Sequence, residues 1–305
     1  MTLNRTIKTM INNPLVQRHL VPWLATAWFC AITNLVALMP MILPSSVHAD
    51  GTIERNVEYL RRETVQLLAD IYQPTGDGPF SGVLMVHGGA WMSGNKSHVV
   101  QHAKRFMRRG YVVVAINYRL APRHKFPAQL EDCRAALRWM RSNSEKYRID
   151  PTEIAGFGYS AGGQLVCLLG LNPSEDHREC LQAIIAGGAP CEFRQIPESS
   201  KALAYWLGST RRDRPDIYRN ASPTSFVTSD DPPVFLFHGA SDSLVRSSSS
   251  LDLYQRLQDK GVESKMHMVA DSGHLKTFFD PESSNLAVEF LDEALGSAVQ
   301  KQVAP

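Results

Sequence analysis

The sequence has little net charge and few cysteines, and each scarcity excludes a class of protein. Its 305 residues carry 32 Lys and Arg against 30 Asp and Glu, which leaves a net charge of +2. No stretch combines clustered basic residues with interleaved aromatic residues, so the chain lacks the electrostatic footprint of nucleic-acid binding. Cys and His do not recur at the spacings typical of metal ligands, and we therefore expect no metal site.

Residues 1–49 contain no Asp or Glu, unlike the rest of the chain. Basic residues near the N-terminus are followed by an apolar run from Leu20 to Leu43, which prolines interrupt. The run is followed by Val47 and Ala49, small residues at the two positions that a signal peptidase reads. This pattern predicts a signal peptide, and hence a periplasmic or secreted protein. The run is also long enough to span a membrane, so a permanent anchor is the alternative.

Cysteine is used sparingly, at five positions. Cys30 lies in the leader, and its upstream residues do not form a lipobox. Cys133 and Cys167 lie on apolar faces of predicted helices and are expected to be buried thiols. Cys180 and Cys191 flank a predicted strand, where an exported protein could oxidise them. We expect no disulfide to be required for the fold.

Short apolar runs alternate with helical stretches along residues 50–305. Several runs are continuous, as expected for strands buried on both faces of a parallel sheet. The predicted strands are 56–59, 64–72, 82–86, 111–116, 154–159, 183–186, 234–238 and 265–269; the predicted helices are 97–109, 127–147, 164–169, 247–260 and 281–295, with a turn at 150–153. The alternation predicts one α/β domain with a mostly parallel central sheet flanked by helices. Residues 190–232 lack strand periodicity and predict a small cap insertion.

The pentapeptide Gly158-Tyr159-Ser160-Ala161-Gly162 connects a predicted strand directly to a predicted helix. A serine in so tight a turn has a strained backbone, and only very small neighbours fit around it. The pattern therefore predicts that Ser160 is a nucleophile, with its hydroxyl exposed at the sheet edge. Dinucleotide binding is the alternative for this glycine pattern. It is disfavoured because earlier strands precede the motif and the next acidic residues, Glu175 and Asp176, lie in a polar loop.

A serine hydroxyl needs a base to remove its proton, and the base needs an orienting acid. In parallel α/β sheets such groups gather beyond the carboxyl ends of the strands. Asp242 follows the predicted strand 234–238, and His274 follows the last strand, in the chain order Ser, Asp, His that accompanies this turn. Two rivals are disfavoured: Asp271 is expected to be a turn residue, and His238 has no carboxylate after the following strand.

Small residues also follow the buried strand 82–86, in the order His87-Gly88-Gly89-Ala90. The oxyanion formed in acyl transfer needs fixed N–H donors, and a backbone without bulky side chains can approach it closely. We expect donors from Gly88, Gly89 and Ala90, together with the amide of Ala161 beside the nucleophile. A plain turn at the end of the strand is the alternative.

Most of the mature domain, from about Leu67 to Leu295, resembles the α/β-hydrolase esterases, in particular bacterial enzymes near hormone-sensitive lipase and the feruloyl-esterase-like hydrolases. The motifs that carry the resemblance are His87-Gly88-Gly89-Ala90-Trp91, Asn117-Tyr118-Arg119-Leu120-Ala121-Pro122, Phe126-Pro127-Ala128, Gly158-Tyr159-Ser160-Ala161-Gly162-Gly163, His238-Gly239-x-x-Asp242 and Gly273-His274. Ala90 and Tyr159 replace a glycine and an aspartate of the lipase-like pattern, and the feruloyl-esterase-like and formamidase-like branches accept both changes.

The resemblance implies a cofactor-free serine carboxylesterase that uses Ser160, Asp242 and His274. The small cap suggests short-chain or aromatic esters, with Tyr205, Trp206 and Leu207 as candidate pocket residues beside Trp91 and Tyr159, although aromatic clusters are more often packing than pocket. A carbohydrate (acetyl or feruloyl) esterase or an arylformamidase would use the same triad. A binding module that has lost catalysis is the alternative from a different class.

Overall fold

A computed structural model describes residues 51–62, 65–172 and 175–296 of the chain. The predicted leader, residues 1–49, lies outside the described residues. Within that described part, no helix is long and apolar enough to cross a membrane.

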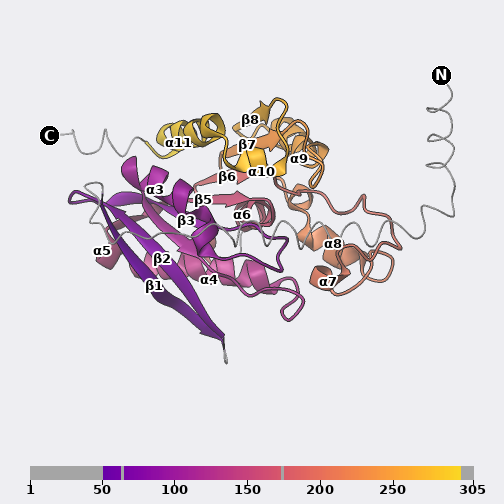
Figure 1. The fold of residues 1–305 in the computed structure, drawn as a ribbon, viewed down its shortest axis with the longest axis horizontal. Coiled ribbons are helices and arrows are strands. Elements are labelled where there is room, and N and C mark those ends of the chain that lie inside the picture. Colours follow the sequence, from indigo (N-terminus) through magenta and orange to yellow (C-terminus); the bar gives the residue numbers. More distant parts are fainter. Residues whose placement is uncertain (1–50, 63–64, 173–174, 297–305) are drawn as a thin grey trace, which may run out of the picture. The chain divides into compact units, whose positions relative to one another are not determined.

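The described residues build one eight-stranded sheet in the order β1-β2-β4-β3-β5-β6-β7-β8 (Figure 1). β1 pairs antiparallel with β2 and β2 with β4, and every other neighbouring pair is parallel. The strands are β1 (Gly51–Arg62), β2 (Val65–Pro74), β3 (Phe80–Val86), β4 (Val112–Ile116), β5 (Ile149–Tyr159), β6 (Ala183–Gly187), β7 (Val234–Gly239) and β8 (Ser264–Val269). The predicted fold class, a mostly parallel sheet flanked by helices, is confirmed.

Helices cover both faces of this sheet because its central strands are apolar on both sides. β3 alternates Val83 and Met85 toward one core cluster with Leu84 and Val86 toward the other. One cluster contains α3 (Val100–Arg108) and α11 (Pro281–Leu295); the other contains α4 (Ala128–Ser142), α6 (Ala161–Leu171) and α9 (Ser248–Asp259). The shorter elements are η1 (Lys96–Val99), α5 (Ser144–Tyr147), η2 (His177–Glu179), α7 (Ala204–Leu207), α8 (Pro215–Ala221), η3 (Pro223–Ser225) and α10 (His274–Phe278).

Within residues 127–159, two predicted elements differ from the structure. The turn predicted at 150–153 is part of β5, where the pairing with β3 jumps from Phe80–Ile149 to Gly82–Ile154. The polar residues there therefore form an irregularity inside the strand and do not end it. The single helix predicted over 127–147 is two helices, α4 and α5, which meet at Asn143.

The segment predicted as a cap, residues 190–232, connects β6 to β7 and contains α7, α8 and η3 (Figure 1). Tyr218 of α8 donates its hydroxyl proton to the carbonyl of Ser209, which lies just after α7, at 3.1 Å. The segment thus has short helices that are tied to one another.

Candidate active site

Ser160 occupies the turn between β5 and α6 with φ of 56° and ψ of −123°. A non-glycine residue at positive φ is strained, and such strain persists only where the surroundings enforce it. The surroundings here have no spare room. A Cβ on Gly158 would lie 2.2 Å from the carbonyl oxygen of Gly162, and one on Gly162 would lie 2.2 Å from that of Val86. The glycines therefore allow the turn that presents Ser160 at the start of α6.

Asp242 and His274 form a direct pair beyond the ends of β7 and β8. His274 Nδ1 lies 2.6 Å from Asp242 Oδ2. Asp242 Oδ1 accepts hydrogen bonds from the backbone N–H groups of Leu244 and Val245, both at 2.9 Å. Burial alone would raise the pKa of the Asp242 carboxyl, but hydrogen bonds from His238 and His274 outweigh it and hold the pKa below its usual range. The carboxylate is thus kept ionised and oriented.

The end of β6 brings this pair to Ser160. The Ser160 N–H donates to the Gly187 carbonyl at 2.8 Å. A Cβ on the next residue, Gly188, would lie 3.1 Å from His274 Cε1 and 2.9 Å from Tyr159 Oη. The Tyr159 hydroxyl also donates to the carbonyl of His274. The structure therefore gathers Ser160, His274 and Asp242 at one edge of the sheet, with Tyr159 as a buried support beneath the histidine.

Residues 87–94, which we call the oxyanion loop, follow β3 and approach Ser160 from the other side. A Cβ on Gly88 would lie 3.2 Å from Ser160 Cβ. Gly89, Ala90 and Trp91 all have positive φ, and the Gly89 carbonyl accepts from Met92 and Ser93. Within the described residues, the N–H groups of Gly89 and Ala90 donate to no acceptor. They are available as donors beside the serine, as is expected of an oxyanion hole.

The predicted pocket residues have different positions from those expected. Trp206 and Leu207 are 0% and 2% exposed, so they are core residues and the prediction that they line a pocket is wrong. The Trp206 ring stacks on Trp91 at 3.6 Å between centroids, and its Nε1 donates to Gln129. Trp91 is buried by the same stack. Tyr205 contacts the oxyanion loop, where its hydroxyl donates to the Ala90 carbonyl at 3.0 Å.

His238 contacts Asp242, which the sequence pattern does not reveal. The lack of a carboxylate after the next strand disfavours His238 as the base, and in the structure its Nε2 lies 3.2 Å from Asp242 Oδ2. The loop after β7 folds back, so a carboxylate four residues later returns to the histidine. The spacing His-x-x-x-Asp is the sequence feature that accompanies this contact. Spacing alone does not show that the loop between the two residues reverses direction.

Asp271, the rejected acid, lies in the loop before His274. It has φ of 48°, and its carbonyl accepts from the Lys276 ammonium group at 3.2 Å. The structure therefore shows it as a turn residue, as predicted.

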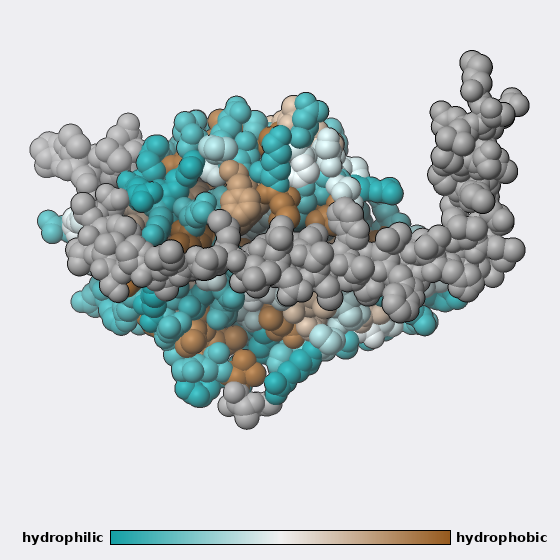
Figure 2. Space-filling model, in the orientation of Figure 1, coloured by the Kyte–Doolittle hydropathy of each residue, from teal (hydrophilic) through white to brown (hydrophobic). Residues whose placement is uncertain are grey.

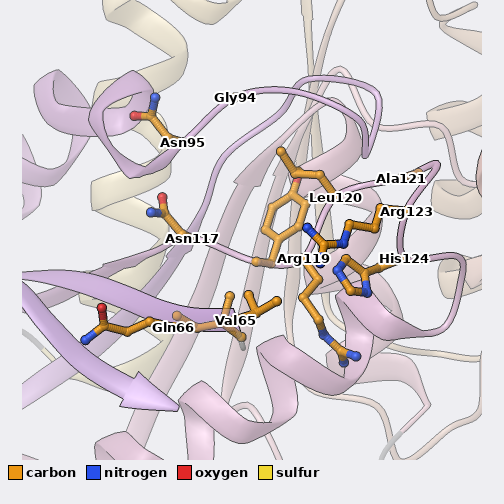
Figure 3. A pocket seen from close by; sticks show the side chains of 12 residues that line it. Val65, Gln66, Gly94, Asn95, Asn117, Arg119, Leu120, Ala121, Arg123 and His124 are labelled. Atoms are coloured by element: carbon orange, nitrogen blue, oxygen red, sulfur yellow. The ribbon is translucent and has the colours of Figure 1, made fainter. Parts of the chain in front are cut away.

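A cavity of about 400 Å³ adjoins the oxyanion loop (Figure 3). Two of its wall residues hold that loop: the Tyr118 hydroxyl donates to the His87 carbonyl at 3.0 Å, and the Ala121 N–H donates to the Trp91 carbonyl at 2.9 Å. Residues that line the cavity therefore also hydrogen-bond to the backbone of the oxyanion loop. The lining residues are Val65, Gln66, Leu67, Gly94, Asn95, Asn117, Tyr118, Arg119, Leu120, Ala121, Arg123 and His124.

Cys133, Cys167, Cys180 and Cys191 are free thiols in the structure, so Cys180 and Cys191 are not bonded to each other. Within the ranges that the structure describes, no group of His, Cys, Asp and Glu is arranged to hold a metal ion.

Comparisons with known proteins identify the family and the fold of the chain. The BD-FAE family model matches residues 69–257, more than half of the chain. Esterase LipC of Mycobacterium tuberculosis is 29% identical over 202 residues, which are 61% of this chain and 49% of LipC. The chain thus spans about half the length of the curated mycobacterial esterases that it matches.

Solved structures show the same fold. A truncated carbohydrate esterase from gut microbiota superposes with a TM-score of 0.73 and 24% identity over 82% of this chain and 98% of its own. Apo esterase 2 of Thermogutta terrifontis gives 0.69 and 24% identity over 82% and 97%. On the family match and this shared architecture, the chain belongs to the BD-FAE family and has the fold of the α/β-hydrolase esterases.

Proposed function

We propose that the protein is a serine carboxylesterase that hydrolyses short-chain or aromatic esters through an acyl-enzyme. The observation that carries the proposal is the strained Ser160 turn at the same sheet edge as the Asp242–His274 pair. Strain of this kind is maintained at functional sites, and a buried Asp–His pair is what a serine needs to become a nucleophile.

The hydrogen bonds support a role for each residue in this proposal. His274 Nδ1 is engaged by Asp242, so Nε2 is the nitrogen left to accept the Ser160 proton. As the serine oxygen bonds to the ester carbonyl carbon, that proton moves to His274. His274 then returns it to the alkoxide oxygen as the carbon–oxygen bond breaks, and the alcohol leaves. Water repeats the sequence on the acyl-enzyme and releases the acid.

The negative oxygen of each tetrahedral intermediate needs donors that are already in place. The unpartnered N–H groups of Gly89 and Ala90, and that of Ala161 at the start of α6, are the donors in this proposal. Removing one such donor in other enzymes costs about 10²–10³ in kcat. The start of α6 adds a favourable dipole.

Exposed apolar side chains on the segments that carry the site residues support an uncharged substrate. Met92, Leu244 and Leu275 are large apolar side chains that are 41%, 44% and 39% exposed. Each belongs to a segment that carries a site residue: the oxyanion loop, the Asp242 loop and the start of α10. Exposed apolar groups on these segments favour binding of apolar substrate surface.

A carbohydrate ester is the second candidate, and the cavity beside the oxyanion loop is the observation that favours it. Asn117 Oδ1 accepts from the Lys96 N–H and Asn95 Oδ1 from the Ser97 N–H, both at 2.8 Å. Neither amide NH₂ group donates to an acceptor among the described residues, so both are available as donors. Figure 3 shows Arg119, Arg123 and His124 on the opposite part of the lining. A cavity of this volume, whose lining combines these polar groups with apolar side chains, suits a sugar next to the ester, and one structural neighbour is a carbohydrate esterase.

The test compares the full-length protein with Ser160→Ala on p-nitrophenyl acetate, butyrate and decanoate, methyl ferulate, an acetylated xylo-oligosaccharide and N-formylkynurenine. We expect turnover of the short or aromatic esters that is lost in the variant. Preference for the oligosaccharide would favour the second candidate, and preference for N-formylkynurenine would identify an arylformamidase. Full activity of Ser160→Ala would refute the mechanism. A folded native protein without turnover would favour a binding module.

We also propose that the protein is exported and cleaved after Ala49. The basic start, apolar run and small residues of 1–49 support this. N-terminal sequencing of the protein from the envelope of a bacterial host should begin at Asp50. Retention of the leader in the membrane fraction would instead establish an anchor.

A further inference from the structure

His238, near the end of β7, has a ring that is fully buried and fully hydrogen-bonded. Its Nε2 lies 2.9 Å from the Val245 carbonyl and 3.2 Å from Asp242 Oδ2, and its Nδ1 lies 2.8 Å from Ser250 Oγ. A base for Ser160 would need a free ring nitrogen facing the substrate. His238 has none, so its function must be sought in what it contacts.

The partners determine where the ring carries its proton. Nε2 faces a carbonyl and a carboxylate, and neither can donate, so Nε2 carries hydrogen. Nδ1 faces the Ser250 hydroxyl, whose single proton can go either to Nδ1 or to the Ala189 carbonyl at 3.1 Å, and Nε2 carries hydrogen in both cases. The Nε2–H is thus shared between the Val245 carbonyl and the Asp242 carboxylate.

The carboxylate of Asp242 consequently receives four donors. Leu244 and Val245 hold Oδ1, whereas His274 and His238 both address Oδ2. We infer that His238 is a positioning residue: it donates to Asp242 Oδ2 and so holds the carboxylate plane and divides its charge between two imidazoles. This inference rests on the proposed serine-hydrolase function.

Loss of the His238 donor has a defined consequence. Oδ2 would retain His274 as its only imidazole donor, and the carboxylate charge would act more strongly on that ring. The protonated form of His274 is then favoured, and protonated His274 cannot accept the Ser160 proton. The acidic limb of the rate profile should therefore move to higher pH, and kcat should fall.

Other titratable groups face this cluster, and they remain neutral in the range of the assay. Tyr159 of β5 packs against His274, and burial raises the pKa of its hydroxyl. Cys191, after β6, lies near Ser250, and a hydrogen bond with Cys167 together with burial raises the pKa of its thiol. The acidic limb of the pH–rate profile therefore reflects the protonation of the cluster formed by Asp242 and the two histidines.

The test uses full-length protein with His238→Leu, which removes the donor, and His238→Gln, whose amide can place an N–H near the Nε2 position. We expect His238→Leu to lower kcat by roughly 10- to 100-fold, the range for a hydrogen bond to a charged group, with little change in KM and an acidic limb at higher pH. His238→Gln should keep most of the activity and the native limb. Ser250→Ala, which leaves the Nε2 donor in place, is the matched control and should keep the native limb.

A merely structural role would give a different result. His238→Leu would then lose activity only in proportion to its unfolded fraction, measured by circular dichroism, and the limb would not move; that result would overturn the inference.

A second readout does not depend on turnover. The low-field proton resonance of the His274–Asp242 hydrogen bond, followed in the Ser160→Ala background, should shift with His238→Leu and stay in place with His238→Gln. An unchanged resonance in His238→Leu would also overturn the inference, whereas failure of the proposed function would appear separately, as activity that survives Ser160→Ala.

Discussion

The substitution Asp242→Asn should abolish most of the activity without unfolding the protein, because the structure determines how the new amide must face. The carboxylate accepts from two backbone N–H groups on Oδ1 and from two imidazoles on Oδ2. An asparagine has one accepting oxygen and one donating NH₂ group. The NH₂ group must therefore face either the two backbone N–H groups or the two imidazoles.

An imidazole can change its tautomer and become an acceptor, whereas a backbone N–H group can only donate. Facing the NH₂ toward Leu244 and Val245 would leave two buried N–H groups unpaired, at about 1–3 kcal/mol each. Facing it toward the imidazoles costs less, because His274 can move its proton from Nδ1 to Nε2 and accept from the amide. That tautomer cannot take a proton from Ser160, and the expected loss in kcat is about 10⁴-fold.

The assay is p-nitrophenyl butyrate hydrolysis near pH 7.5, with thermal unfolding measured in parallel. Asp271→Asn is the matched control, because Asp271 is the acid nearest to His274 in sequence but serves the turn through its backbone. We expect its activity to match that of the native protein. Activity of Asp242→Asn within tenfold of native would refute the assignment of the acid.

Three further predictions concern the fold around the site. Gly162→Ala would place a Cβ 2.2 Å from the Val86 carbonyl oxygen, so we expect little soluble protein on expression; a normal yield with native activity would contradict this tight packing. Trp206→Ala should lower the free energy of unfolding in urea by about 3–5 kcal/mol, because it empties a core position, whereas a pocket residue would cost little. The lowered pKa of Asp242 implies stability that is present above about pH 4 and lost as the pH falls through the folded-state pKa. The urea midpoint of the native protein should therefore fall more steeply between pH 5 and pH 2 than that of Asp242→Asn, and parallel curves would refute the linkage.

The parts of the site that depend on local chain geometry could be predicted from sequence. Glycines two residues to either side of Ser160 are needed wherever a serine turns directly from strand to helix, so the pattern indicates the turn itself. Asp242 and His274 could be located because parallel strands place their carboxyl ends at one edge. Their pairing at 2.6 Å depends on two loops, which carry no periodicity.

The differences between the predicted and the observed structure arise from contacts between distant segments. Trp206 and Leu207 lie in a segment without strand periodicity, and nothing local reveals that Trp91, 115 residues earlier, stacks on the first of them. The residues at 150–153 have turn chemistry, but pairing with β3 keeps them in the sheet. The contact of His238 with Asp242 is likewise hidden in the sequence, because the return of the loop after β7 is decided by tertiary contacts.

The stacking of Trp206 on Trp91 ties the segment 190–232 to the oxyanion loop, so that neither can move without the other. Trp91 Nε1 donates to the side-chain oxygen of Gln164 in α6 at 2.9 Å. The amide NH₂ group of the same glutamine donates to the Ala221 carbonyl of α8 at 2.7 Å. Swinging the segment outward as a hinged lid would break this bridge, the ring stack and the bond from Tyr205 to Ala90 together. A chimera that exchanges residues 190–232 for those of a relative must therefore bring a partner for Trp91, or it will displace the backbone beside Ser160.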